Sequence, residues 1–145
     1  MNWILVAIDG SEGANRAIDY AAHWATRENL GLLIVNVMGG YGLPDKALRS
    51  LTDGQTAWFK EILASLSAEI LKDARARAWS TGARSTELES RAGEVAPTLI
   101  EIARERKAQA IVVGKRGTGR ITGLLLGSVS QALVSLAPLP VVVVP

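Results

Sequence analysis

The stretch WILVAIDGSE, residues 3–12, contains the first signs of a fold that alternates strands and helices. Its continuous apolar run, residues 3–8, is typical of a strand that is buried on both faces of a parallel sheet. Ser11 stands where it can cap a helix, and Glu12 adds an acidic side chain near the positive end of that helix. The stretch therefore predicts a strand, a tight turn at Asp9 and Gly10, and a helix.

The same alternation continues toward the middle of the chain. The first helix should run to about residue 28 and be followed by a strand over residues 32–37. The signal is weak over residues 38–56, where glycine and proline favour an open loop with a short helical turn near residues 46–51. Residues 57–80 predict a long amphipathic helix, because apolar residues recur every four positions. Its expected buried face consists of Trp58, Ile62, Leu66 and Ile70.

The second half completes the pattern. Residues 84–90 form a more polar strand, which suggests a sheet edge, and the helix that begins near Val95 should end in an exposed charged run at residues 104–107. A strand over residues 110–113, a helix over 128–136 and a strand over 141–144 follow. Alternation of this kind predicts an α/β fold, a single-domain open five-stranded parallel sheet with helices on both faces. We expect one domain over residues 1–145.

Composition excludes several classes of function. The chain lacks cysteine, and His23, its single histidine, lies within the first helix, so thiolate catalysis, a Ser-His-Asp triad and a multi-histidine zinc site are disfavoured. The net charge of +2 gives no indication of nucleic-acid binding. The printed sequence has no apolar run of about 18–20 residues that would cross a membrane, nor a basic leader that would mark a signal peptide. A cytoplasmic protein is the expectation.

The chemistry is concentrated in a glycine-rich segment that directly follows the strand at residues 110–113. Five glycines fall within residues 114–127, and basic side chains accompany them at Lys115, Arg116 and Arg120. Glycine lets backbone N–H groups approach a bulky anion, and the helix that opens after Gly127 offers further free N–H groups to phosphate. The segment predicts a phosphate-binding loop at the carboxyl edge of the sheet.

Two common phosphate motifs do not fit this loop. A Walker A motif needs Ser or Thr after its lysine, whereas Lys115 is followed by Arg116. A G-x-G-x-x-G fingerprint fails because Gly123 comes one residue too late after Gly117 and Gly119, and because the loop follows the fourth strand. Both motifs are rejected.

A third pattern matches at every fixed position: Gly114, two residues, Gly117, nine residues, Gly127 and Ser128. This is the G-2x-G-9x-G-[S/T] signature of the ATP-binding branch of the universal stress protein family, which the chain resembles over almost its whole length. The resemblance implies a Rossmann-like, adenine nucleotide α-hydrolase-like sheet with strand order 3-2-1-4-5. It also implies a dimeric stress-response regulator that binds ATP or another adenine nucleotide, with room for Mg²⁺ as a companion ion.

The resemblance also implies the roles of individual residues. The backbone of Val37 corresponds to the position that recognises adenine, Ala7 lies beside the base, and Asp9 corresponds to the acid that bonds the ribose hydroxyls. The turn that contacts ribose and phosphate and the stretch that closes over the phosphates match Val113, Gly114, Arg116, Gly117, Gly127, Ser128 and Val129. The valine-rich strand Val141–Val144 matches the family's terminal strand, which pairs two subunits across a two-fold axis.

Several alternatives stay open at this point. In one alternative, Asp9 serves only as a helix cap. In the same way, the basic loop residues are then ordinary solvated charges that bind no ligand. The protein would also be a slow ATPase or a nucleotide-dependent transferase if a catalytic base and metal ligands accompanied the loop. A third reading is a dimeric interaction module that binds no nucleotide.

Overall fold

A parallel sheet forms the centre of the molecule. The computed structural model describes residues 1–39, 49–115 and 126–145. The strands follow the order β3-β2-β1-β4-β5, and all neighbours are parallel, as predicted. The elements along the chain are β1 (Trp3–Ala7), α1 (Glu12–Glu28), β2 (Gly31–Met38), α3 (Asp53–Ser80), β3 (Thr86–Ala92), α4 (Val95–Glu105), β4 (Ala108–Gly114), α5 (Ser128–Leu136) and β5 (Val141–Val144).

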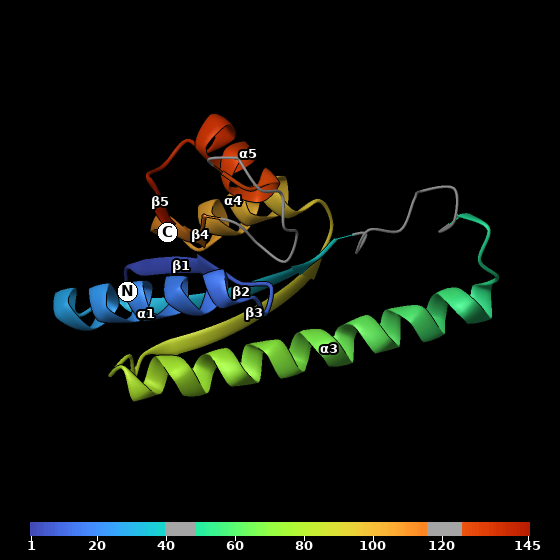
Figure 1. Ribbon diagram of the computed structural model, residues 1–145, viewed down its shortest axis with the longest axis horizontal. Coiled ribbons are helices and arrows are strands. Elements are labelled where there is room, and N and C mark those ends of the chain that lie inside the picture. Colours follow the sequence, from blue (N-terminus) through green and yellow to red (C-terminus); the bar gives the residue numbers. More distant parts are fainter. Residues whose placement is uncertain (40–48, 116–125) are drawn as a thin grey trace.

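Helices cover both faces of this sheet (Figure 1). One apolar core lies between the sheet and helices α1 and α3, and a second lies between the sheet and helices α4 and α5. The central strands alternate between the two cores, so that Ile4 and Val6 face the first and Leu5 faces the second. Within the described ranges, no helix combines the length and hydrophobicity that a membrane crossing requires.

Helix α1 forms where and how the sequence predicts. The Ser11 hydroxyl accepts a hydrogen bond from the Ala14 N–H at 3.2 Å, which satisfies one of the free donors in the first turn. The helix ends at Asn29, which adopts the left-handed conformation with φ of 56°. Its buried stripe consists mostly of alanine: Ala14, Ala17, Ile18, Ala21, Ala22 and Ala25. The small alanines let the helix axis lie close to the sheet.

Helix α3 begins earlier than predicted, and only the second half of its predicted apolar row meets the core. It starts at Asp53, where Thr52 and Gln55 form a reciprocal capping box. The face that meets the sheet contains Ser67, Leu71, Ala74 and Ala78, of which Ala74 and Ala78 continue the predicted row at the same spacing after Ile70. The first three predicted residues are exposed, Trp58 by 64%, Ile62 by 36% and Leu66 by 51%, whereas Ile70 packs against the core. The prediction was wrong for the first half of the helix because this half extends past the sheet (Figure 1).

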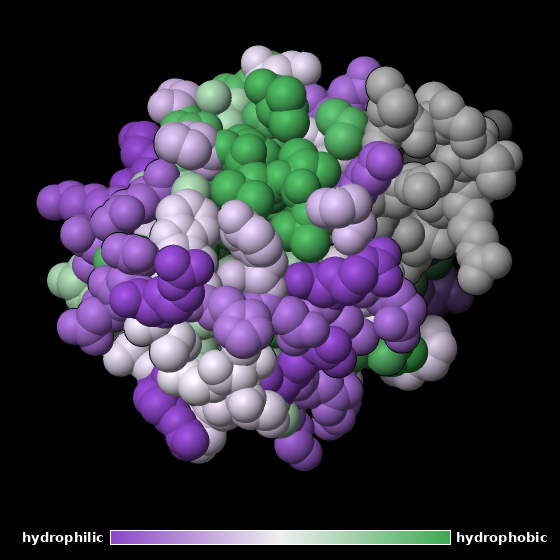
Figure 2. Space-filling model, turned by 60° about the vertical axis from the view of Figure 1, so that its left-hand side comes forward, coloured by the Kyte–Doolittle hydropathy of each residue, from purple (hydrophilic) through white to green (hydrophobic). Residues whose placement is uncertain are grey.

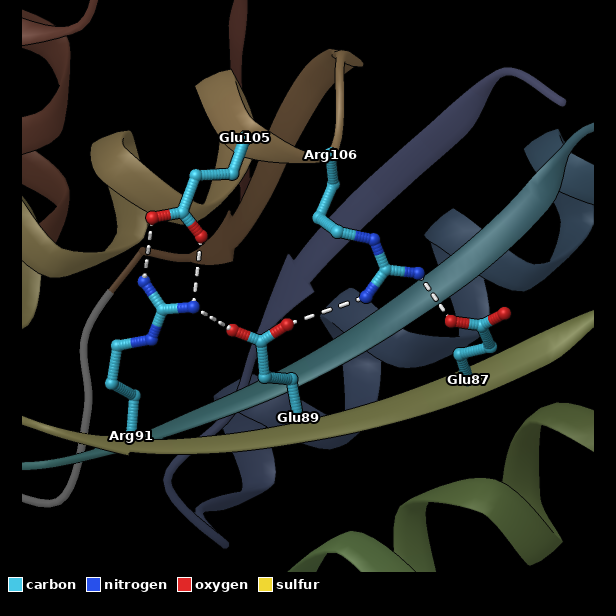
Figure 3. A network of polar contacts seen from close by, with 5 residues as sticks. All are labelled: Glu87, Glu89, Arg91, Glu105 and Arg106. Carbon is cyan, nitrogen blue, oxygen red and sulfur yellow. Dashed lines mark hydrogen bonds and ion pairs between the residues drawn. The ribbon is translucent and has the colours of Figure 1, made fainter.

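Strand β3 is an edge strand, as its polarity predicts, and an ionic network lines one of its faces (Figure 3). Glu89 lies between two arginines, 2.6 Å from Arg91 and 3.3 Å from Arg106. Arg91 also contacts Glu105 at 2.9 Å, and Arg106 also contacts Glu87. The end of α4 is therefore tied to the sheet, whereas the sequence suggested a simple solvated helix end.

A second ion pair joins the two helices on the opposite face. Arg77 of α3 donates two hydrogen bonds to the Asp19 carboxylate of α1, at 2.7 and 2.8 Å. These hydrogen bonds hold the pKa of Asp19 below its ordinary value of 3.8. The pair therefore stabilises the fold above pH 3.8, and this contribution is lost as the pH falls through the folded pKa.

Replacement of Asp19 by asparagine should therefore lower stability at neutral pH and not in acid. We expect a loss of less than about 1 kcal/mol at pH 7, because both side chains are more than a third exposed. The difference from the parent should shrink as urea unfolding is repeated at pH values below 3.8. Arg77→Gln should remove the same pH-dependent contribution, and a difference that stays constant with pH would contradict the assignment.

Candidate functional site

The strand order brings two predicted site segments to one edge of the sheet. β1 lies between β2 and β4, with Val6 paired to Val112. The turn at Asp9 and Gly10 leaves the carboxyl end of β1, and Lys115 follows the carboxyl end of the adjacent strand β4. After β1 the chain continues to the face of the sheet that α1 covers, and after β4 it continues to the opposite face, which α5 covers. This is the point of reversed winding at which open α/β sheets bind ligands.

Asp9 stabilises the turn that leads into α1. One carboxylate oxygen accepts a hydrogen bond from the Ser11 N–H at 3.0 Å. Gly10, between them, has φ of 84°, a left-handed conformation that favours glycine. The capping bond of the helix comes from Ser11 and not from Asp9. Asp9 is exposed, and its second oxygen has no hydrogen-bond partner in the part of the chain that the structure describes.

Three of the predicted residues share one face of the sheet. Ala7, Val37 and Val113 lie at or one residue before the carboxyl ends of three neighbouring strands, and all three pack in the core beside α4 and α5. Each is less than a tenth exposed. The Val37 carbonyl accepts a hydrogen bond from the Gly39 N–H at 3.1 Å, which turns the chain away from β2. The three side chains thus form an apolar floor at the carboxyl edge of the sheet.

Gly114 has a packing reason to be glycine. A Cβ atom at this position would lie 2.9 Å from the backbone carbon and oxygen of Gly13, in the first turn of α1. Backbone atoms of a helix cannot yield as a flexible side chain would. The close approach of β4 to α1 therefore requires glycine here, whatever else the loop does.

We expect Gly114→Ala to destabilise the fold by about 1–3 kcal/mol, the usual cost of overpacking. Gly54→Ala is the matched control, because a Cβ atom there meets nothing within 4 Å. It lies inside α3, so it should stabilise the protein by about 0.5–1 kcal/mol. Urea unfolding of both variants measures the difference, and equal stability of Gly114→Ala and the parent would contradict the close approach.

The first turn of α5 presents unpaired backbone donors to the same edge. Gly127, the residue before the helix, offers no side-chain cap. Among the described residues, the N–H groups of Ser128, Val129 and Ser130 have no acceptor. Ser128 is exposed, whereas Val129 packs against the core. Free N–H groups at a positive helix end are the usual binding groups for phosphate and carboxylate.

The carbonyl of Lys115 holds this helix start in place. It accepts hydrogen bonds from the Gly127 N–H at 2.7 Å and from the Ser130 hydroxyl at 2.9 Å. The Lys115 N–H in turn donates to the Val144 carbonyl of β5 at 2.8 Å. The start of α5 is thereby fixed to the end of β4. Arg116 and Gly117, which were also predicted, lie outside the described residues.

A shallow groove of about 320 Å³ runs beside Ser128. Val129 and Ala132 of α5 form one wall, and Glu94 and Val95 at the start of α4 form the other. In the described ranges, no group of three acidic, histidine or cysteine side chains is placed to hold a metal ion. The groove has room for part of a small ligand next to the free N–H groups.

Sequence reasoning missed one residue at this edge. Asn36 is 3% exposed, and its side-chain amide donates to the Ile8 carbonyl at 2.7 Å, immediately before Asp9. It thereby fixes the chain where β1 gives way to the turn. Its own carbonyl oxygen is buried and finds no partner within the described residues. The one available signal was a single amide side chain inside the apolar strand LLIVNV.

These features define an open α/β domain with free backbone N–H groups at the reversal point of its parallel sheet. The profile of the universal stress protein family matches residues 1–145. Universal stress protein YxiE of Bacillus subtilis is 31% identical over 146 residues, covering 99% of this chain and 98% of that protein. The chain belongs to the universal stress protein family. Some relatives are longer: the chain spans 47% of universal stress protein Rv1996 of Mycobacterium tuberculosis, at 32% identity.

Solved structures of the family share the fold. A universal stress protein in complex with cAMP superposes with a TM-score of 0.73 at 28% identity, over 99% of this chain and 95% of that chain. The protein from Archaeoglobus fulgidus in complex with dAMP superposes with a TM-score of 0.71 at 24% identity, over 100% and 98%. The second likeness concerns the fold alone. Adenine nucleotides are thus bound by structural neighbours of this chain.

Proposed function

We propose that this protein is a cytoplasmic regulator that binds an adenine nucleotide, with ATP and Mg²⁺ as the leading candidates. The main observation behind this proposal concerns the start of α5, which lies next to the end of β4. Three N–H groups there lack an acceptor among the described residues. The G-2x-G-9x-G-S pattern of residues 114–128 supports the same site. The cAMP complex of a 28% identical neighbour supports adenine nucleotides as the ligand class.

In this proposal, different residues bind the phosphates, the ribose and the base of the nucleotide. The phosphates lie at the N–H groups of Ser128 and Val129, where the helix dipole and the Ser128 hydroxyl stabilise negative charge. Gly114, Arg116, Gly117 and Gly127 are the further residues that we assign to contacts with the ribose and the phosphates. Asp9 accepts hydrogen bonds from the ribose hydroxyls through its free oxygen. The base lies over the apolar floor formed by Ala7, Val37 and Val113.

The test is a thermal-unfolding series with ATP, ADP, AMP and cAMP at millimolar concentration, with and without Mg²⁺. A nucleotide that binds only the folded state raises the melting temperature by mass action. Asp9→Asn should weaken every ribose-containing ligand, while inorganic triphosphate, which lacks ribose, should bind it as it binds the parent. Absence of any shift with all four nucleotides would overturn the proposal and favour a module that binds none.

We further propose that two copies pair through β5. This strand is the second edge of the sheet, and its four valines are half-buried in the single chain. Figure 2 shows an apolar surface in the upper part of the molecule. Val134 and Leu136 of α5, the helix that precedes β5, are exposed large apolar residues. An uncovered apolar edge strand is a template for pairing with another strand. Antiparallel pairing of two β5 strands gives a symmetric dimer.

A further inference from the structure

The first half of α3 carries an apolar ridge that the fold does not use. Helix α3 extends well past the sheet toward its beginning (Figure 1). Trp58, Ile62 and Leu66 repeat every four residues on this part, and all three are exposed. Residues four apart are neighbours on a helix surface, so the three side chains form one continuous strip. Exposed strips of large apolar side chains are characteristic of interaction surfaces.

The ridge leads into a cleft between α3 and α1. Its next member is Ile70, which contacts the turn after β1: a Cβ atom on Gly10 would lie 3.5 Å from the Ile70 side chain. The cleft there has a volume of about 220 Å³ and is also lined by Asn15, Ile18 and Asp73. The exposed strip therefore ends in a hollow that is large enough for one side chain of a partner.

A row of acidic residues accompanies the ridge on its outer side. Glu61, Glu69 and Asp73 each lie three residues after a member of the apolar ridge, so they form a parallel row together with Ser65. None of the three carboxylates takes part in an ion pair with any residue that the structure describes. Lys60 and Lys72 belong to the next row, beyond the acidic one. The face thus consists of an apolar row bordered by unpaired negative charge.

We infer that this face of α3 binds an amphipathic helix of another protein, with apolar residues four apart and lysine or arginine beside them. Such a helix would lay its apolar row against Trp58, Ile62 and Leu66 and its cations against Glu69 and Asp73. One of its side chains would enter the cleft at Ile70. From Trp58 to Asp73 the surface is about 22 Å long, which matches a partner helix of about four turns.

Charge distinguishes this occupant from others. In a pair of α3 helices from two copies of the chain, both acidic rows would lie at one interface, and like charges there are unfavourable. A membrane surface with anionic lipids would repel the same row. A basic amphipathic helix is the occupant that satisfies both the apolar and the acidic row.

The test uses two synthetic 18-residue peptides, labelled with fluorescein. Both have leucine at the same positions with helical spacing; one has lysine at its polar positions, and its twin has glutamate there. Fluorescence anisotropy with the full-length protein should show at least tenfold tighter binding of the lysine peptide. Glu69→Lys together with Asp73→Lys should reverse this preference.

A matched pair of double variants separates the ridge from general effects on α3. Ile62→Ser with Leu66→Ser should weaken the lysine peptide at least tenfold. Ala64→Ser with Ala68→Ser introduces the same groups at the same spacing on another exposed side of the helix, and it should bind as the parent does. Equal loss in both pairs, or equal binding of the two peptides, would overturn the inference. So would sedimentation analysis in which only Ile62→Ser with Leu66→Ser changes the oligomeric state, because the face would then belong to a second copy.

Discussion

Gly127→Asp is expected to weaken nucleotide binding by at least about a hundredfold while leaving the fold intact. Gly127 precedes α5 with φ of −72°, a conformation open to any residue. Aspartate at this position accepts hydrogen bonds from the N–H groups of the first turn, so it should stabilise the helix by a few tenths of a kcal/mol. The same carboxylate would occupy the donors proposed for phosphate and repel it. A hundredfold loss corresponds to about 2.8 kcal/mol of binding free energy.

Titration calorimetry with ATP and Mg²⁺ measures this effect, and thermal unfolding without ligand measures the fold. Gly127→Asn is the matched control, because asparagine caps the helix equally well without the negative charge. It should lose less affinity than the aspartate variant. If Gly127→Asp binds ATP as the parent does, the phosphates do not lie at the start of α5.

Val143→Pro should convert the proposed dimer into a folded monomer. The carbonyls of Pro140 and Val144 accept hydrogen bonds from the N–H groups of Ile111 in β4 and of Lys115 directly after it. Since backbone groups of alternate residues in a strand point to opposite sides, the Val143 N–H faces the free edge. Proline there removes a donor needed for pairing with another β5 and leaves the bonds to β4 in place. Sedimentation velocity reports the mass, and circular dichroism reports the fold.

Val143→Thr is the control for this substitution, because it keeps the N–H group and the branched shape of the side chain. It should remain dimeric at concentrations where Val143→Pro is monomeric. A dimer that persists in the proline variant would exclude backbone pairing through β5 and direct attention to the exposed face of α5.

The sequence predicted those parts of the fold in which local and tertiary preferences agree. Ser11, the alanine stripe of α1 and the continuous apolar strands each specify one arrangement, and the structure has that arrangement. Helix α3 shows the opposite case. Its apolar row keeps one spacing from Trp58 to Ala78, but only the part from Ile70 onward meets the core, because the first half of the helix extends past the sheet. Periodicity carries no such information.

The candidate site was predictable to a similar degree. The position of Asp9 near the end of β4 follows from the strand order, which the family resemblance implied and the structure confirms. The approach of Gly114 to Gly13 depends on how closely α1 packs, and the hydrogen bond from Asn36 to Ile8 depends on strand register. Neither distance is contained in a motif. The roles of the site residues in binding a ligand stay predictions.

The charged side chains of β3 have a consequence for how large an assembly this protein builds. If both edge strands of the sheet could pair with other subunits, each added subunit would leave another edge free for pairing. The assembly would then grow into fibres. The edge strand β3 carries the charged side chains of Glu87, Glu89 and Arg91, and their desolvation on pairing would cost free energy. In the proposed dimer, the valine strand β5 is the edge that pairs with a second subunit. Growth should therefore stop at two subunits, even at high protein concentration.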